Sequence, residues 1–189
     1  MTSLKYQIVI IMFLCSVMAR SQQSKADTAV VRSYGGIQVF YNCKPLHPYW
    51  VLGKMAGKAT VSHASAAFAR YASEAQWNYP NCTGIIIDDI HFDNDHYEVI
   101  RTLQVAGYQD TAVFAGDIFM SATPVRPYEV VNTMRLRPDW GSLQTNLTKL
   151  FAKAGELMIA YDGIMVDDID FGFGKSDIRV IRWTGSDGH

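Results

Sequence analysis

Two stretches of the chain place apolar side chains at helical spacing. Between residues 142 and 158 the apolar positions recur every three or four residues, which gathers them on one face of a helix. They are Leu143, Leu147, Leu150, Phe151, Ala154 and Leu157. A shorter stripe within 62–77 consists of Phe68, Tyr71, Ala72 and Ala75. Each stretch starts at a serine, Ser62 or Ser142, which favours an N-cap, so the pattern predicts two amphipathic helices.

Short apolar runs rich in β-branched and aromatic residues flank both helices and predict strands. Around the first helix these runs are 37–41, 49–56, 84–92 and 97–105. Around the second helix they are 111–115, 128–136, 163–171 and 178–183. Each half of the chain therefore reads as strand, strand, helix, strand, strand.

The two halves repeat one another at a fixed distance along the chain. When residues 48–92 are laid over 127–171 with a shift of 79 and no gap, 11 of 45 positions are identical. Both segments begin with Pro-Tyr-x-Val and end with Asp-Asp-Ile-x-Phe, at 88–92 and 167–171. A further slip of two residues aligns Val99-Ile100-Arg101 with Val180-Ile181-Arg182. We interpret the chain as a tandem duplication, and residues 79 apart are called repeat partners below.

These elements predict an α+β fold of two tandem ββαββ units. We expect the units, 36–107 and 108–189, to pack as a pseudo-twofold pair, each a small mixed sheet with one helix. Neither half is large enough to bury an extensive core alone, which favours packing of one on the other. Two separate beads joined near 107–110 remain the alternative. The polar residues 22–35 predict a flexible segment before the first unit.

The N-terminus has the pattern of a secretory signal peptide, residues 1–21. Lys5 precedes a 12-residue apolar run, 8–19, and small residues for cleavage follow. The run is shorter than the roughly 20 residues of a transmembrane helix, although an uncleaved anchor is the alternative. The residues before Cys15 are too large for a lipoprotein signal, so we expect no lipidation. We therefore expect a periplasmic or secreted protein with no transmembrane span in the mature chain.

Charge argues against a nucleic-acid partner. Removal of residues 1–21 takes away Lys5 and Arg20 from 17 basic residues and none of the 18 acidic ones, which leaves 15 minus 18, or −3. Lysine and arginine are interspersed with acids, whereas a nucleic-acid-binding face needs them clustered.

The first unit resembles a known superfamily in three segments. These are Ile37-Gln38-Val39-Phe40-Tyr41-Asn42, then Pro48-Tyr49-Trp50-Val51-Leu52-Gly53-Lys54-Met55-Ala56-Gly57, and Thr83-Gly84-Ile85-Ile86-Ile87. They are similar to the YbjQ-like and RcsF-like superfamily of small α/β domains, which includes domains described as heavy-metal-binding. The match covers about 70 residues; the second unit keeps Pro127-Tyr128 but has Asn132 and Leu136 where glycines would stand. The resemblance implies a module that assembles or binds partners, and it carries no catalytic residues.

Two cysteines remain in the mature chain, Cys43 and Cys82. An exported protein meets an oxidising compartment, and the RcsF-like members are disulfide-bonded envelope sensors. In the topology that the resemblance implies, both cysteines lie at one end of the sheet, so we expect a disulfide between them. Cysteine positions do not transfer one to one from that superfamily, and two free buried thiols remain the alternative.

The acidic motif is the strongest candidate for chemistry. Asp88, Asp89 and His91 are good ligand types for a divalent metal, and Asp89 and His91 share one face of a strand. The second copy, Asp167-Asp168-Ile169-Asp170, offers a second set. No cofactor is certain, and a divalent metal is one hypothesis. The other interpretation is a strand that leaves the core, with one aspartate in solvent or bonded to a loop.

No catalytic motif accompanies the repeat. A Gly-x-Ser-x-Gly sequence is absent, and a hydrolase would need a deep pocket that holds His63 or His91. Trp50 and Trp77 flank the first strand and helix and are candidates for an interaction surface. We therefore expect a non-enzymatic interaction or assembly module, with envelope sensing as one role and with another envelope protein or a second copy as the partner. A metal- or ligand-binding protein is the alternative, and a small hydrolase ranks third.

Overall fold

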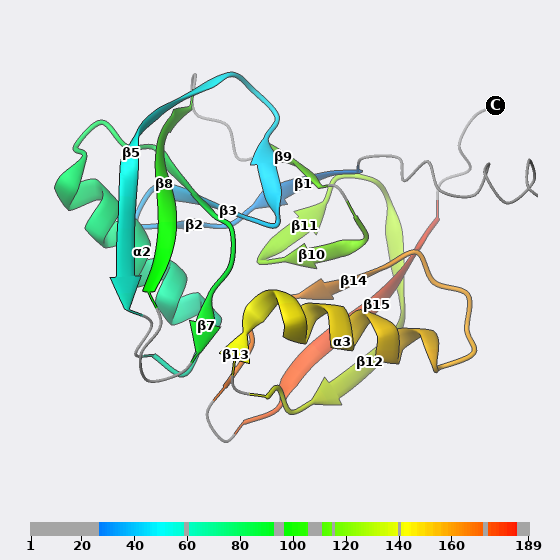
Figure 1. The fold of residues 1–189 in the computed structure, drawn as a ribbon. Coiled ribbons are helices and arrows are strands. Elements are labelled where there is room, and N and C mark those ends of the chain that lie inside the picture. Colours follow the sequence, from blue (N-terminus) through cyan, green and yellow to red (C-terminus); the bar gives the residue numbers. More distant parts are fainter. Residues whose placement is uncertain are drawn as a thin grey trace, which may run out of the picture.

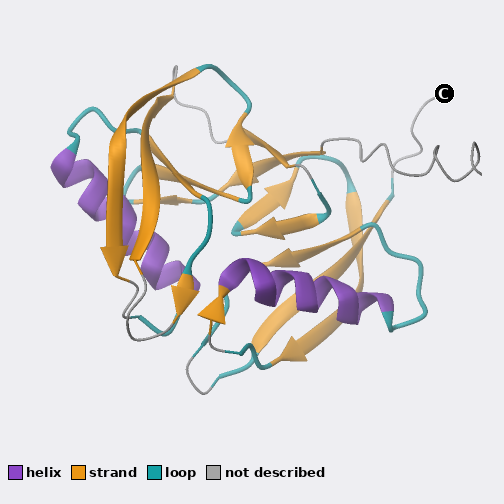
Figure 2. Cartoon of the chain, in the orientation of Figure 1, coloured by secondary structure: helices purple, strands orange, loops and turns teal. Residues whose placement is uncertain are grey.

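The computed structural model describes residues 27–58, 61–92, 97–105, 111–114, 116–139, 141–171 and 174–184. The expected signal peptide lies outside these residues. The described residues form an α+β fold with the helices α2 (Ala64–Asn78) and α3 (Leu143–Gly155) and several small sheets (Figures 1 and 2). Within this described part, neither helix has the length and apolar character needed to cross a membrane.

The first half builds a mixed five-stranded sheet. Its order is β2 (Ser33–Tyr34), β3 (Ile37–Tyr41), β6 (Gly84–Ile87), β8 (Tyr97–Val105) and β5 (Tyr49–Lys58). Strands β3 and β6 are parallel, and the other pairs are antiparallel. Helix α2 packs against β3 and β6. Strand β5 lies at the edge of the sheet.

The second half builds a four-stranded sheet with the same order. It runs β10 (Ile118–Met120), β14 (Gly163–Val166), β15 (Ser176–Trp183) and β12 (Tyr128–Leu136). Again the first pair is parallel and the others are antiparallel. Val39 pairs with Ile85 in one sheet, and their repeat partners Ile118 and Ile164 pair in the other. Helix α3 crosses this sheet in Figure 1.

A third sheet joins the two halves. Its order is β11 (Ala122–Pro124), β1 (Asp27–Val31), β9 (Thr111–Phe114) and β4 (Cys43–Pro45). Strand β1 pairs with β11 from the second half, and β9 pairs with β4 from the first. The two central strands pair with each other through Ala29 and Ala112. Two further short strands, β7 (His91–Phe92) and β13 (Gly141–Ser142), also pair across the halves.

Two predictions about the starts of the units were wrong. The parallel partner of β14 is β10, so 111–115 is not the counterpart of 37–41. The segment 22–35 is not wholly a flexible lead-in either, because residues 27–31 form β1. Ala29 and Val31 are buried in that strand while Val30 is exposed. The alternation covers only three residues of a polar segment, which is too short to predict a strand from the sequence.

The predicted alignment of the last strands was also wrong. Ile100 pairs with Ile87 in β6, and the residue that pairs with Val166 in β14 is Ile178. Ile100-Arg101 therefore corresponds to Ile178-Arg179, a shift of 78, and not to Ile181-Arg182. Residues 99–101 read Val-Ile-Arg, whereas residues 178–182 read Ile-Arg-Val-Ile-Arg and so contain Ile-Arg twice. The preceding valine matched only the second Ile-Arg, which led to the wrong register.

The two halves share their apolar core. One cluster of buried residues includes Phe68, Tyr71 and Ile87 from the first half with Leu147 and Ile164 from the second. A second cluster, on the opposite face of the sheets, likewise mixes Phe40 and Leu103 with Phe119 and Ile181. Both apolar clusters therefore contain residues of both halves, which two separate beads would not give.

Two glycines of β5 explain where the halves differ. A Cβ at Gly53 would overlap the ring of Tyr79, and one at Gly57 would overlap the ring of Tyr71. Their repeat partners are Asn132 and Leu136, and there the facing residues change as well. Tyr71 is matched by the smaller Leu150, which leaves room for Leu136.

This exchange predicts a compensated pair of substitutions. Gly57→Leu alone should destabilise the protein by about 1–3 kcal/mol, because it overpacks the contact with the fully buried Tyr71. Gly57→Leu together with Tyr71→Leu copies the second half and should recover part of that loss. Urea unfolding of both variants measures the difference. Additive losses in the double variant would contradict the explanation.

Candidate functional site

The second aspartate of the first motif caps the helix of the other half. Asp89 lies between β6 and β7, and its side chain is about one-third exposed. Its carboxylate accepts hydrogen bonds from Ser142 Oγ at 2.5 Å, Ile90 N at 2.8 Å, Gln144 N at 3.0 Å and Tyr41 Oη at 3.2 Å. Ser142 and Gln144 begin α3, whose first-turn amides lack partners within the helix. Asp89 therefore stabilises the start of α3, where a negative charge also suits the helix dipole.

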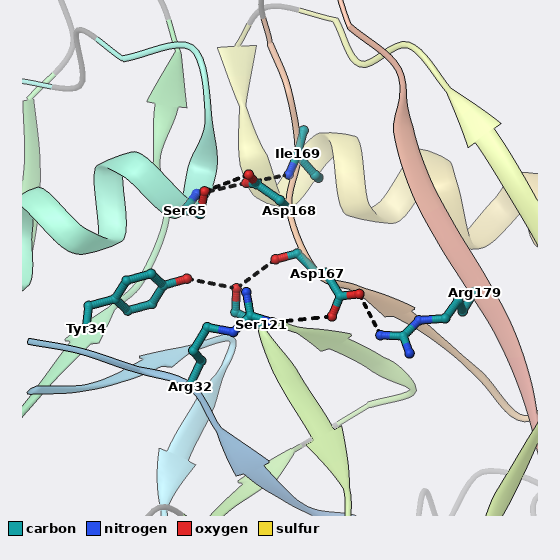
Figure 3. Close-up of polar contacts among 8 residues, drawn as sticks. All are labelled: Arg32, Tyr34, Ser65, Ser121, Asp167, Asp168, Ile169 and Arg179. Carbon is teal, nitrogen blue, oxygen red and sulfur yellow. Dashed lines mark hydrogen bonds and ion pairs between the residues drawn. The ribbon is translucent and has the colours of Figure 1, made fainter. Parts of the chain in front are cut away.

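The second motif makes the reciprocal contact. Asp168 accepts hydrogen bonds from Ser65 Oγ at 2.6 Å, Ile169 N at 2.8 Å and Ser65 N at 2.9 Å (Figure 3). Ser65 lies in the first turn of α2, and it is the repeat partner of Gln144. Asp168 therefore does for α2 what Asp89 does for α3. His63, the N-cap of α2, makes no side-chain cap of its own, so this aspartate takes that place.

The backbone around each motif completes the junction. Leu143 N donates to Ile90 O at 2.7 Å, and Ala64 N donates to Ile169 O at 3.0 Å. Between the two motifs the rings of Phe92 and Phe171 stack, with centroids 3.9 Å apart and an interplanar angle of 12°. Both rings are almost fully buried. The residues from Asp89 to Phe92 and from Asp168 to Phe171, with the two helix starts, are called the junction below.

The first aspartate of each motif faces an arginine of its own sheet. Asp88 pairs with Arg101, and Asp167 pairs with Arg179 at 2.7 Å. Asp167 also lies 3.7 Å from Arg32, and its backbone oxygen accepts from Ser121 Oγ at 3.1 Å (Figure 3). The two carboxylates of each motif therefore have different partners: the first binds an arginine at the surface, and the second binds the start of the helix in the other half.

This geometry does not bring the predicted metal ligands together. Asp89 and His91 share a face as predicted, with Oδ2 and Nε2 3.4 Å apart. Asp88 is paired with Arg101 instead, and the oxygens of Asp89 are occupied by protein donors. In the described ranges no group of three or more histidine, cysteine or acidic side chains could hold a metal ion. The metal hypothesis is therefore replaced by a structural role for Asp88 and Asp89.

No protein-family model, curated protein or solved structure matches this chain.

The junction also lacks the order of a catalytic triad. Ser65 Oγ donates to Asp168, and His63 Nδ1 lies 3.6 Å from the same carboxylate. In a working triad the histidine stands between the serine and the acid, because it must take the serine proton. Here the acid stands between the other two. His63 instead lies beside Asp168 and Asp170, in the bridge that pairs it with Asp170.

The two cysteines are free, so the expected disulfide is absent. Cys43 belongs to the apolar cluster on one side of the sheets, and Cys82 belongs to the cluster on the other. Cys82 Sγ donates to the backbone oxygen of Gly84 at 3.1 Å. Burial raises the pKa of both thiols, which keeps them protonated at neutral pH. The prediction failed because β3 and β6 are parallel: Cys43 follows the end of β3 and Cys82 precedes the start of β6, so the two cysteines lie at opposite ends of the sheet.

Two tryptophans and one strand edge remain exposed. Trp50 on β5 is 60% exposed, and Trp77 near the end of α2 is 87% exposed. Leu46 and Val51 are also about half exposed, and Val51 lies at the β-bulge of the edge strand β5. On β12 the repeat partner of Trp50 is Glu129, which pairs with Arg182 at 2.5 Å. The first edge is thus the more apolar of the two.

A half-buried aspartate in the second half, Asp117, predicts a pH-dependent stability. Burial, followed by the charges of Asp27 and Asp162, raises the pKa of Asp117. The native state therefore holds that proton more tightly than the unfolded state does. The resulting loss of stability is absent below an ordinary aspartate pKa of about 3.9, grows as the pH rises toward the raised value and is complete above it.

Asp117→Asn should therefore raise the melting temperature modestly at pH 7, and the gain should fade near pH 3.5, which is below about 3.9. Thermal unfolding at the two pH values measures this. A gain that is the same at both values would show that charge is not the cause.

Sequence reasoning missed the partners of the motif. Ser65 and Gln144 carry no local signal, because their partners Asp168 and Asp89 lie far away in the sequence. The useful signal was the repeat itself: both copies keep Asp-Asp-Ile-x-Phe although the helices that precede them differ in sequence. A motif retained in both halves without metal-binding spacing indicates a contact that the halves make with each other.

Proposed function

We propose that this chain is an exported, non-enzymatic protein-interaction module built from a duplicated ββαββ unit, with its two copies related by a pseudo-twofold axis. The matching sheet orders, the matching bulges at Val51 and Val130 and the reciprocal caps support the duplication. The resemblance of the first unit to YbjQ-like and RcsF-like domains supports a place in the cell envelope. In this proposal the junction makes the chain one body, and function resides on its surface.

The observation that carries the proposal is the exposed edge strand β5. An edge strand offers unpaired backbone groups to an extended segment of another protein. Trp50 stands 60% exposed there, beside Val51, and tryptophan is a frequent anchor of interfaces. Among the side chains that the structure describes, strand β5 carries Lys54 and no acid, so the favoured partner is an extended segment of another envelope protein with acidic and apolar residues.

The difference between the two edges argues for such a partner over a second copy. On β12 the place of Trp50 is taken by Glu129, whose charge is already paired with Arg182. A single specialised edge suits a different protein, whereas self-assembly through both edges would use both alike.

A photo-crosslinking amino acid at position 50, with position 129 as the matched control, tests this proposal in the cells that export the protein. We expect adducts to one other envelope protein at position 50 and not at position 129. Purified partner should then lose binding to Trp50→Ala, a variant whose melting temperature stays unchanged because the side chain is largely exposed. Equal adducts at both positions, or adducts only between copies of the chain, would overturn it.

A further inference from the structure

A cavity opens on the first half beside the Asp88–Arg101 pair. Its volume is about 370 Å³, and its walls include Cys43, Ile86 and Val113, with Lys44 and Arg101 among the polar residues. Ile86 and Cys43 are nearly fully buried, so the deeper wall is apolar. This face of the sheet lies on the other side from α2, because Phe40, Ile86 and Leu103 belong to the cluster that excludes the helix.

Positive charge dominates the polar side of this cavity. Arg101 uses one guanidinium nitrogen to bind Asp88, while its Nε is buried and has no hydrogen-bond partner in the part of the chain that the structure describes. Lys44 is exposed, and Lys54 stands directly opposite Arg101 on β5.

The corresponding hollow in the second half provides a comparison within the same chain. It has about 150 Å³ and is lined by Arg32, Ser121, Thr123 and Asp167 among others. Here Asp167 faces two arginines, Arg179 and Arg32, and no lysine is among the described residues that line the hollow. The repeat partners of Lys44 and Lys54 are Thr123 and Thr133. The first half thus has more space and two additional lysines.

We propose that the cavity beside Arg101 binds a small organic anion, a carboxylate with a short apolar chain. The guanidinium of Arg101, whose side chain is 31% exposed, and the ammonium of Lys44 hold the carboxylate, since both groups form charge-assisted hydrogen bonds with it. The chain of the ligand lies on Ile86, Cys43 and Val113, where its burial is favourable. The excess positive charge disfavours a metal cation at the same place. This site is separate from the interaction of β5 with a partner strand and does not depend on it.

The test is an NMR titration of the mature protein, residues 22–189, with hexanoate, hexylamine, hexanol and inorganic phosphate. We expect hexanoate to shift the amides of Lys44, Arg101 and Val113 and to leave those of Thr123, Arg179 and Val30 unchanged. Hexanol and phosphate should bind more weakly than hexanoate, because each offers only half of the interaction, and hexylamine should not bind.

Lys44→Thr, which copies the second half, should weaken hexanoate about fivefold, the effect of one exposed charge contact. The matched control is Lys175→Thr in a remote loop, which should leave the affinity unchanged. Because Lys44 is exposed, its variant keeps the fold. The proposal is overturned if hexanoate shifts none of these amides, if it shifts both halves alike, or if hexylamine or phosphate binds equally well.

Discussion

Replacement of Phe171 by alanine should cost about 3–5 kcal/mol of folding free energy, the range for truncation of a buried phenylalanine. The ring is 1% exposed and stacks on Phe92, so the variant loses both burial and the aromatic contact. For a chain of this size that corresponds to a fall in melting temperature on the order of 10 °C. Phe92 comes from the first half, and the loss should therefore be felt by both halves together.

Calorimetry of Phe171→Ala measures this outcome. We expect one cooperative transition at lower temperature, because both apolar clusters contain residues of both halves. A double-mutant cycle with Phe92→Leu and Phe171→Leu should give a coupling energy of about 0.5–1.5 kcal/mol. Two separate transitions, with a lower melting temperature only for the transition of the second half, would show that the halves are independent.

Loss of the cap aspartates should have the second largest effect. Asp89→Ala and Asp168→Ala should each cost about 2 kcal/mol, since each removes an N-terminal cap and leaves further donors without an acceptor. Asp89 accepts four hydrogen bonds and Asp168 accepts three. Urea unfolding gives the values.

The matched control for the cap variants is the adjacent residue. Asp88→Ala removes one surface ion pair, with a side chain that is 65% exposed, and should cost at most about 1 kcal/mol. If Asp88→Ala were as destabilising as Asp89→Ala, the assignment of the cap to Asp89 and of a surface ion pair to Asp88 would be wrong.

The helices and longer strands could be predicted because their patterns are local. The interval 128–136 is strand β12, 97–105 is β8, and Ser142 is the N-cap of α3 with Thr145 N bonded to its hydroxyl. Apolar periodicity is enough for such elements, since one face of each packs on the core. Ser62 failed as a cap because Asp168 of the other half does that work.

The short strands of the joining sheet could not be predicted. Strands β4 and β11 are three residues long, which is too short for a period to appear. Their pairing depends on contacts 70 or more residues away, such as Cys43 with Phe114 and Ala29 with Pro124. Strand identity there is set by tertiary packing, which outweighs weak local preference.

The candidate site shows the same limit. The sequence marked Asp88, Asp89 and His91 as unusual, and Asp89 is the one of the three that binds the helix of the other half. The sequence left a metal site and a structural role open, because the two donors that decide the role of Asp89, Ser142 and Gln144, come from the opposite half. A carboxylate in a repeat can accept a hydrogen bond from a backbone amide as readily as it can coordinate a metal, and only the arrangement in space distinguishes the two.

Amide hydrogen exchange at Gln144 and Ser65 tests most directly whether each motif holds the helix of the other half. Gln144 N donates to Asp89, and Ser65 N donates to Asp168. In Asp89→Ala, exchange at Gln144 should rise at least about tenfold more than exchange at Ser65, the factor for a lost contact of about 1.4 kcal/mol. Asp168→Ala should give the reverse. Equal increases at both amides, or changes confined to residues 88–92, would contradict the reciprocal junction.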